Sequence, residues 1–211
     1  MKKAVILARS FARSSKDPLQ RLEAAGIQVV IKKNPDPENQ EIVSELIGDA
    51  EGVLVGVDRI GEIVLTKCSN LRVISKHGVG VDNIDLKAAQ KHGVLVTNAP
   101  GTNSVSVAEM AFALVLLLAR KIPHFIEQVR EKEWGATRFG IELEGKSIGI
   151  VGLGRIGKAV GHYAQAFGMK VLFFDPLIPT EMPPFKKVEL EELFKEADFI
   201  TLHAPLTHET R

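Results

Sequence analysis

Three glycines at G-x-G-x-x-G spacing, Gly152, Gly154 and Gly157, form the part of the sequence best suited to bind a ligand. They follow an apolar run of strand length and precede a helical pattern, which predicts a strand, a tight turn and a helix. Gly152 allows the turn, Gly154 lets the backbone approach a phosphate, and Gly157 lets the helix pack closely on the strand. The N–H groups and the positive dipole at the start of this helix favour the pyrophosphate of a dinucleotide.

A second apolar run, residues 171–174, ends in Asp175. A carboxylate at the tip of the second strand can accept hydrogen bonds from both ribose hydroxyls of NAD, and it would repel the 2′-phosphate of NADP. The pattern therefore predicts NAD as the cofactor. The alternative is a glycine-rich turn followed by an acidic loop residue, with no ligand at either place.

A second loop that could bind a ligand, residues 76–85, follows the expected strand at residues 71–75. Ligands of open α/β sheets bind outside the carboxyl ends of the strands, and a loop with two glycines can aim backbone N–H groups at an anion. A carboxylate would suit this loop, with Lys76 adding positive charge. The alternative is a turn that the glycines merely permit, with Asp82 or Asn83 capping the next helix.

The first hundred residues alternate short apolar runs with helical patterns. Strands are expected at residues 4–8, 27–31, 52–56, 71–75 and 94–97, and helices at residues 17–26, 38–47, 60–67 and 85–92. Alternation at this spacing produces parallel strands joined by right-handed helical crossovers. We therefore predict an α/β, flavodoxin-like domain over residues 1–98.

A turn-rich stretch follows, typical of a hinge, and leads into a long helix. Ser106 and Glu109 have the spacing of a capping box, and residues 110–119 are apolar on every face. This apolar run is too short to span a bilayer, so the helix is expected to be buried on all sides. One side could contact another subunit or a large surface of the same chain. Pro123 should end or kink this helix, before a second helical segment at about residues 124–132.

Residues 99–211 are expected to hold the two linking helices and a Rossmann-type NAD-binding domain that is incomplete at its C-terminus. The apolar run at residues 199–202 would lie beside the strand that leads into the glycine turn, so that its end faces the cofactor. This makes His203, Ala204 and Pro205 candidates for the wall of the cofactor site. The alternative for His203 is a histidine at a strand end, hydrogen-bonded by backbone groups.

The composition is that of an ordinary globular protein, with 45% hydrophobic and 25% charged residues in 211. A net charge of +1 without basic blocks gives no electrostatic basis for binding nucleic acid or an anionic membrane. The partners are therefore expected to be small molecules or other protein chains. The single cysteine, Cys68, excludes an intrachain disulfide framework, and the first apolar run is too short for a secretory signal. We expect a cytoplasmic protein with no metal site.

Four stretches, residues 76–85, 98–109, 152–157 and 203–210, together resemble the D-isomer-specific 2-hydroxyacid dehydrogenases, closest to the phosphoglycerate dehydrogenase branch. The resemblance covers the chain from about residue 51 onward. It implies an N-terminal substrate-binding domain and an inserted NAD-binding domain. It also implies that the helices within residues 104–132 join the two domains and build a homodimer.

The resemblance also implies roles for single residues. Val79 and Gly80 match the loop that grips the substrate carboxylate through backbone N–H groups, beside Lys76. Arg155 and Ile156 match cofactor-contacting positions within the glycine motif that contains Gly152, Gly154 and Gly157. Asp175 would bind the ribose, and the adenine-side wall would be formed by His203, Ala204 and Pro205.

The function implied is reversible hydride transfer between carbon 2 of a D-2-hydroxy acid and the nicotinamide of NAD. In this family the catalytic arginine, glutamate and histidine lie downstream of the H-x-P-L-T-x-E-T segment, which here begins at His203. None of the histidines present lies in that catalytic motif, so no catalytic residue is assigned. We therefore expect the sequence to be a fragment of a longer enzyme, and the 211-residue chain alone to be inactive.

The substrate is expected to resemble 3-phosphoglycerate, or to be glyoxylate or hydroxypyruvate as the keto partner. Phosphoglycerate dehydrogenases usually carry an arginine just after the strand matching residues 52–55, where it serves the substrate phosphate. This chain has Gly56, and Arg59 three positions later could replace the arginine from a shifted loop. The alternative function is an NAD-sensing binding protein resembling the C-terminal-binding corepressors.

Overall fold

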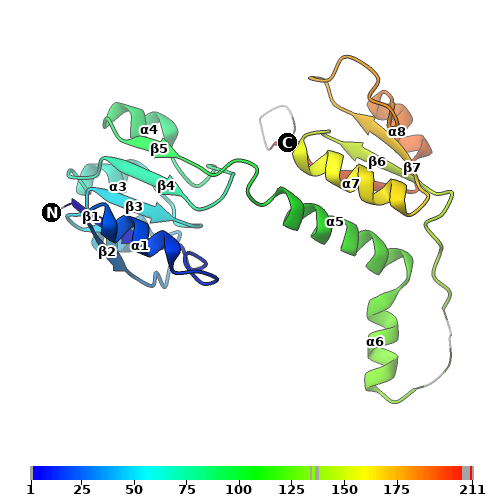
Figure 1. Cartoon of the computed structure of the whole chain (residues 1–211), viewed down its shortest axis with the longest axis horizontal. Coiled ribbons are helices and arrows are strands. Elements are labelled where there is room, and N and C mark those ends of the chain that lie inside the picture. Colours follow the sequence, from blue (N-terminus) through cyan, green and yellow to red (C-terminus); the bar gives the residue numbers. More distant parts are fainter. Residues whose placement is uncertain (1, 134, 136–137, 206–209, 211) are drawn as a thin grey trace. The chain divides into compact units, whose positions relative to one another are not determined.

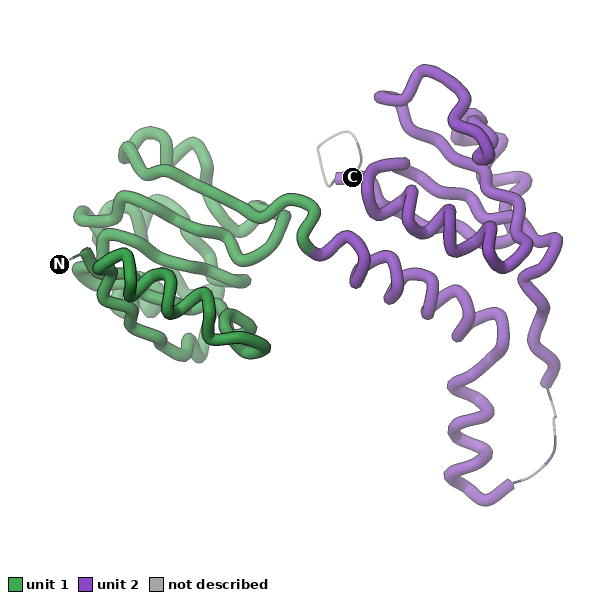
Figure 2. Tube along the Cα trace, viewed as in Figure 1, with its two compact units in different colours: residues 1–102 green, residues 103–211 purple. Residues whose placement is uncertain are grey.

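The computed structural model describes residues 2–133, 135, 138–205 and 210 (Figure 1). The chain divides into two compact units, unit 1 (Met1–Thr102) and unit 2 (Asn103–Arg211), which Figure 2 colours separately. None of the helices in the described ranges is both long enough and apolar enough to cross a membrane. Each unit has its own sheet and its own hydrophobic core.

Unit 1 is a five-stranded parallel sheet in the order β2-β1-β3-β4-β5. Its strands are β1 (Lys2–Ile6), β2 (Ile27–Ile31), β3 (Gly52–Val55), β4 (Val73–Lys76) and β5 (Leu95–Thr97). Its helices are α1 (Asp17–Ala24), α2 (Gln40–Ile47), α3 (Glu62–Lys67) and α4 (Leu86–Lys91). This strand order is that of flavodoxin-like sheets, so the expected fold class of this unit is confirmed.

The helices of unit 1 cover both faces of its sheet. Val5, Val53 and Ile74 project from the strands into one buried cluster with residues of α2, α3 and α4. Helix α1 packs next to β2 and lies in front of the sheet in Figure 1. The four crossover helices therefore fix where the strands end, and the loops that follow those ends meet along one edge.

Unit 2 is a four-stranded parallel sheet in the order β8-β7-β6-β9. Its strands are β6 (Ser147–Val151), β7 (Lys170–Phe174), β8 (Lys186–Lys187) and β9 (Phe199–Leu202). Its helices are α5 (Ser104–Ala119), α6 (Ile122–Arg130), α7 (Arg155–Ala166) and α8 (Leu190–Glu196). Strand β9 pairs with β6, as the sequence predicted, whereas the short strand β8 was not predicted.

Helices α7 and α8 contribute to different buried clusters of unit 2. Ile150 and Phe173 belong to a cluster that α7 and α5 complete, and Leu193 of α8 belongs to another. Gly149 permits the close approach of α8, because a Cβ built on it would lie 2.4 Å from Leu193 Cδ2. The strand that leads into the glycine turn is therefore held firmly by packing.

Helix α5 differs from its expected form in two respects. It begins at Ser104 after Asn103, so Ser106 lies inside the helix and the predicted capping box is wrong. Four residues of α5 are buried in the core of unit 2: Ala108, Phe112, Val115 and Ala119. The opposite face is open in this chain, where Met110, Leu114 and Leu118 are 63%, 51% and 69% exposed. Burial on all sides is therefore wrong for the single chain, since α7 covers only one face.

The break between α5 and α6 lies two residues before Pro123. Lys121 has a left-handed backbone with φ of 51°, which ends the helical path, and Pro123 occupies the first turn of α6. Proline suits the first turn of a helix because its missing N–H would have no intrahelical partner there. Pro123 therefore begins α6 rather than ending α5.

Candidate functional site

The turn between β6 and α7 needs glycine at two positions. Gly152 has φ of 91°, and a Cβ built on it would lie 2.8 Å from both the amide N of Ala204 and the carbonyl carbon of His203. A Cβ on Gly157 would lie 2.2 Å from the carbonyl oxygen of Gly152. Both conflicts are with backbone atoms, which cannot move aside as a side-chain end can. The turn is therefore compressed between the start of α7 and the end of β9.

Gly154 differs because nothing lies near its missing side chain. It is the N-cap of α7, and a Cβ on it would meet no heavy atom within 4 Å. In the part of the chain that the structure describes, the N–H groups of Gly154 and Ile156 donate to no acceptor. Arg155 is exposed at the first helical position, and Ile156 is half-buried against the core. The helix start thus offers open space and N–H donors to a phosphate.

Asp175 follows β7 directly and is oriented by two backbone amides. Its Oδ2 accepts a hydrogen bond from the N–H of Leu153 at 2.8 Å, and its Oδ1 accepts from the N–H of Leu177 at 2.9 Å. The first bond ties the carboxylate to the glycine turn itself. Each carboxylate oxygen keeps a further lone pair, so the group can also accept from ribose hydroxyls.

His203 follows β9 and completes this edge of unit 2. Its backbone N–H donates to the carbonyl of Val151 at 2.8 Å, and its Nε2 lies 2.9 Å from the hydroxyl oxygen of Thr201. Burial lowers the pKa of the imidazole, which favours its neutral form. Ala204 and Pro205 are exposed beside it. Residues 206–209 of the H-x-P-L-T-x-E-T segment lie outside the described residues.

The loop after β4 holds two backbone donors ready for an anion. The carbonyl of Val79 accepts from the side-chain amide of Asn98 at 2.8 Å, and the carbonyl of Gly78 accepts from the N–H of Ala99 at 2.9 Å. The N–H groups of Val79 and Gly80 donate to no group among the described residues. The loop is therefore fixed by its carbonyls while its N–H groups stay available.

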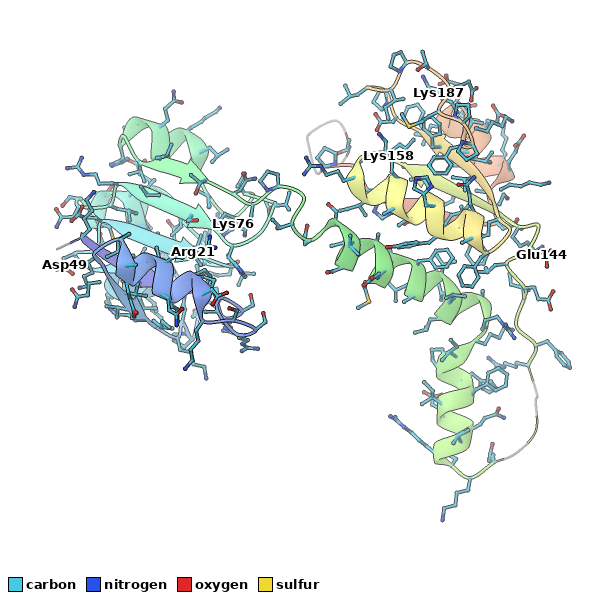
Figure 3. All side chains as sticks on the ribbon, in the orientation of Figure 1. Arg21, Asp49, Lys76, Glu144, Lys158 and Lys187 are labelled. Atoms are coloured by element: carbon cyan, nitrogen blue, oxygen red, sulfur yellow. The ribbon has the colours of Figure 1, made fainter. Side chains whose placement is uncertain are left out.

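Lys76 is the last residue of β4 (Figure 3). Two oxygens hold its side chain in place. Its Nζ donates to the carbonyl of Gly56 at 2.5 Å and to Oδ1 of Asn83 at 2.7 Å. Asn83 therefore positions Lys76 and does not cap α4. The cap is Asp85, whose Oδ1 accepts from the N–H of Ala88 at 2.9 Å, so the interpretation that Asp82 or Asn83 caps this helix is wrong.

Lys76, Gly78 and Gly80 line a cavity of about 610 Å³ at the carboxyl ends of β1, β3 and β4. Besides Lys76, Gly80 and Asp82, the lining includes four residues with chemically active side chains: Arg9, Ser10, Asp58 and His77. These four residues were not predicted from the sequence as part of a site. The signal was present, because the loops after β1 and β3 end at the same sheet edge as the loop after β4.

Arg59 does not lie in this cavity. It lines a neighbouring hollow of about 430 Å³, and its Nη1 lies 3.6 Å from Oε2 of Glu38. The structure therefore gives no support to Arg59 as a replacement for the arginine that phosphoglycerate dehydrogenases carry after this strand. No group of three side chains able to hold a metal ion occurs within the described ranges.

Comparison with known proteins agrees with this geometry. Residues 112–211 match the family described as "D-isomer specific 2-hydroxyacid dehydrogenase, NAD binding domain". The chain is 47% identical over 178 residues to D-3-phosphoglycerate dehydrogenase of Methanocaldococcus jannaschii, covering 82% of this chain and 34% of that protein. It is 40% identical over 211 residues to the enzyme of the same name from Rattus norvegicus, covering 97% of this chain and 39% of that protein.

A solved structure shows the same likeness in three dimensions. The crystal structure of NAD⁺-bound 3-phosphoglycerate dehydrogenase from Entamoeba histolytica has a TM-score of 0.82 and 35% identity, covering 99% of this chain and 64% of that one. The chain thus spans only about a third to two fifths of the length of the curated relatives described above. With its parallel sheets, glycine turn and strand-end carboxylate, it belongs to the D-isomer-specific 2-hydroxyacid dehydrogenase family and carries that family's NAD-binding domain.

Proposed function

We propose that the full-length protein is an NAD-dependent oxidoreductase that transfers a hydride between a D-2-hydroxy acid and the nicotinamide. The observation that carries the proposal is the edge of unit 2, where the compressed glycine turn, the open space at Gly154 and the oriented carboxylate of Asp175 lie together. When bound, NAD supplies the hydride acceptor. The chain's own residues bind and orient the two reactants.

In this proposal the start of α7 binds the pyrophosphate. Gly152, Gly154 and Gly157 keep side chains out of its path, and the N–H of Ile156 is a donor there. Exposed Arg155 adds a positive charge beside the phosphates. Asp175 accepts from the ribose hydroxyls, and the adenine lies against a wall formed by His203, Ala204 and Pro205.

The substrate belongs to the cavity of unit 1 in this proposal. The N–H groups of Val79 and Gly80 bind its carboxylate, and Lys76 adds a positive charge that two oxygens hold in place. The relatives named as D-3-phosphoglycerate dehydrogenases favour a substrate resembling 3-phosphoglycerate. Glyoxylate or hydroxypyruvate is the other candidate, as the keto partner.

The protein is further proposed to act as a homodimer through α5 and α6. Met110, Leu114 and Leu118 recur at a spacing of four and form an exposed apolar stripe on α5. Ile122, Ile126 and Val129 of α6 are also exposed, and α6 buries no residue in this chain. An apolar surface of this kind is typical of a protein–protein contact.

The test is NADH formation by the full-length protein with a panel of D- and L-2-hydroxy acids, and NADH consumption with the matching keto acids. Sustained turnover restricted to D-isomers is expected. No turnover with any acid, while NAD still binds, would contradict the enzyme and favour an NAD-sensing binding protein like the C-terminal-binding corepressors. The 211-residue chain alone is expected to show no turnover, because no catalytic acid or base is assigned within it.

A further inference from the structure

Arg9 lines the cavity of unit 1, and its guanidinium pairs with no carboxylate among the residues that the structure describes. It follows β1 and lines the same cavity as Lys76 and Gly80. Its Nη2 donates to the carbonyl oxygen of Asn34 at 3.0 Å, and it forms no ion pair within the described ranges. A guanidinium has five N–H donors in a fixed fork, so Arg9 keeps donors available for a ligand.

A chain of buried and part-buried hydrogen bonds connects Arg9 to Lys76. Asn34, which is 1% exposed, accepts from Arg9 through its carbonyl and donates from its side-chain amide to Oδ1 of Asp58 at 2.7 Å. Asp58 is 2% exposed, and its Oδ2 accepts from the N–H of Gly56 at 3.1 Å. The carbonyl of Gly56 then accepts from Lys76 at 2.5 Å. Buried, fully paired polar groups of this kind hold a definite geometry.

The charges of the lining favour an anion on the Arg9 side. Both carboxylate oxygens of Asp58 accept bonds from Asn34 and Gly56, so this group is already satisfied within the protein. The other carboxylate of the lining, Asp82, is exposed on the loop after β4. Arg9, which pairs with neither of these carboxylates, attracts an anionic group to its side of the cavity.

We propose that Arg9 binds a second acidic group of the substrate, a phosphate or a further carboxylate, and thereby makes the enzyme selective for 2-hydroxy acids with two acidic groups. This inference rests on the proposed function, which places the first carboxylate on the N–H groups of Val79 and Gly80. Arginine suits the task because its fork matches the oxygens of phosphate and carboxylate in pairs. Arg9 thus has the role that the sequence suggested for Arg59, binding of the substrate's second acidic group.

The test compares three acids in the full-length protein: 3-phosphoglycerate, D-malate and D-glycerate. Arg9→Met keeps an unbranched stem and removes the guanidinium with its charge. It is expected to lower kcat/KM at least about tenfold for the acid whose second group Arg9 binds, and to change D-glycerate less than about twofold. Loss confined to 3-phosphoglycerate identifies a phosphate, and loss confined to D-malate identifies a carboxylate.

Two further variants serve as controls. Arg9→Lys keeps the positive charge and is expected to recover part of the loss. Arg59→Met removes an exposed arginine that pairs with Glu38 outside the cavity, and it is expected to leave all three substrates unchanged. An equal loss on D-glycerate, or no loss on either acid with two acidic groups, would overturn the role of Arg9.

Failure of the proposed function is recognisable separately. If the wild-type protein turns over none of the acids, the same three compounds are titrated calorimetrically into the NAD-loaded protein and its Arg9→Met variant. Weaker binding of 3-phosphoglycerate or D-malate, with D-glycerate unaffected, would support Arg9 as a ligand-binding residue even without turnover. Equal binding by both proteins would contradict it.

Discussion

At the scale of single residues, the three glycines of the turn act for different physical reasons. Gly157 is required by the fold, because its Cβ would overlap a backbone oxygen at 2.2 Å. Gly154 is not required by the fold, because its Cβ would meet nothing within 4 Å. A matched pair of alanine substitutions therefore separates packing from ligand binding.

Gly157→Ala is expected to lower the free energy of unfolding by about 1–3 kcal/mol, since overpacking against backbone costs this much. Gly154→Ala is expected to change it by less than about 1 kcal/mol, the cost of a poorer N-cap. Gly154→Ala should nevertheless weaken NAD binding about tenfold or more by blocking the phosphate. Urea unfolding and calorimetry measure the two effects. Normal NAD binding by folded Gly154→Ala would contradict the assignment of this turn.

In the proposed function, the choice between NAD and NADP depends on Asp175. Asp175→Ala removes the acceptor for the ribose hydroxyls and the charge that repels a 2′-phosphate. The variant is expected to bind NAD more weakly and to show a smaller preference for NAD over NADP, as measured by titration with both cofactors. If both affinities stay unchanged, Asp175 only orders the loop through Leu153 and Leu177.

His203 makes the stability of the protein depend on pH. Burial lowers its pKa in the folded state, so the folded protein binds the proton less readily than the unfolded chain. Above the ordinary pKa of 6.5, His203 is neutral in both states and the folded protein keeps its full stability. As the pH falls below 6.5 and through the lowered pKa, the unfolded chain takes up the proton more readily and the folded protein loses stability. The Tm is therefore expected to fall between about pH 8 and about pH 5, and to fall less in His203→Asn. An equal fall in both proteins would assign the effect to other groups.

At the scale of elements, the exposed stripe of α5 leads to a prediction about assembly. Leu118 is 69% exposed in the single chain, so Leu118→Glu is expected to leave folding intact and to convert the full-length dimer to monomer. Sedimentation velocity measures the change. Leu177→Glu is the control, because Leu177 is 89% exposed on a loop outside the two helices. A dimer that persists in Leu118→Glu would place the interface elsewhere.

Local patterns predicted the strands better than they predicted burial. The runs that became β2 and β9 were read with the correct bounds, because an apolar run between turn residues leaves few alternatives. The burial of α5 was overestimated, because composition does not show which face has a neighbour within the chain. Strand β8 was missed, because two lysines form a strand only by pairing with β7.

The two candidate binding regions were predictable to different extents, because a sequence pattern shows only what lies within one continuous segment. The glycine turn lies in one continuous segment, and its glycines can be recognised by spacing alone. The cavity of unit 1 joins groups from four segments, so Arg9 becomes meaningful only beside Asn34 and Asp58. The sequence also suggested Arg59, because position along the chain does not reveal that its side chain lines another hollow.

At the scale of the whole molecule, both units place their candidate ligand-binding loops at the carboxyl ends of parallel strands. Unit 1 offers fixed cations and free N–H groups, which suits a small acid, and unit 2 offers a glycine turn and a carboxylate, which suits a dinucleotide. Neither unit supplies an assigned catalytic acid or base. The proposed function therefore depends most on whether unit 2 binds NAD through the turn.

The most direct measurement is an NMR titration of the ¹⁵N-labelled chain with NAD, following the backbone amides of unit 2. The amides of Gly154, Ile156 and Asp175 are expected to shift progressively and to saturate, with NADP producing weaker shifts at the same concentrations. If these three amide signals do not shift, or if the largest shifts lie on the far side of unit 2, the central claim that this turn binds the cofactor is contradicted.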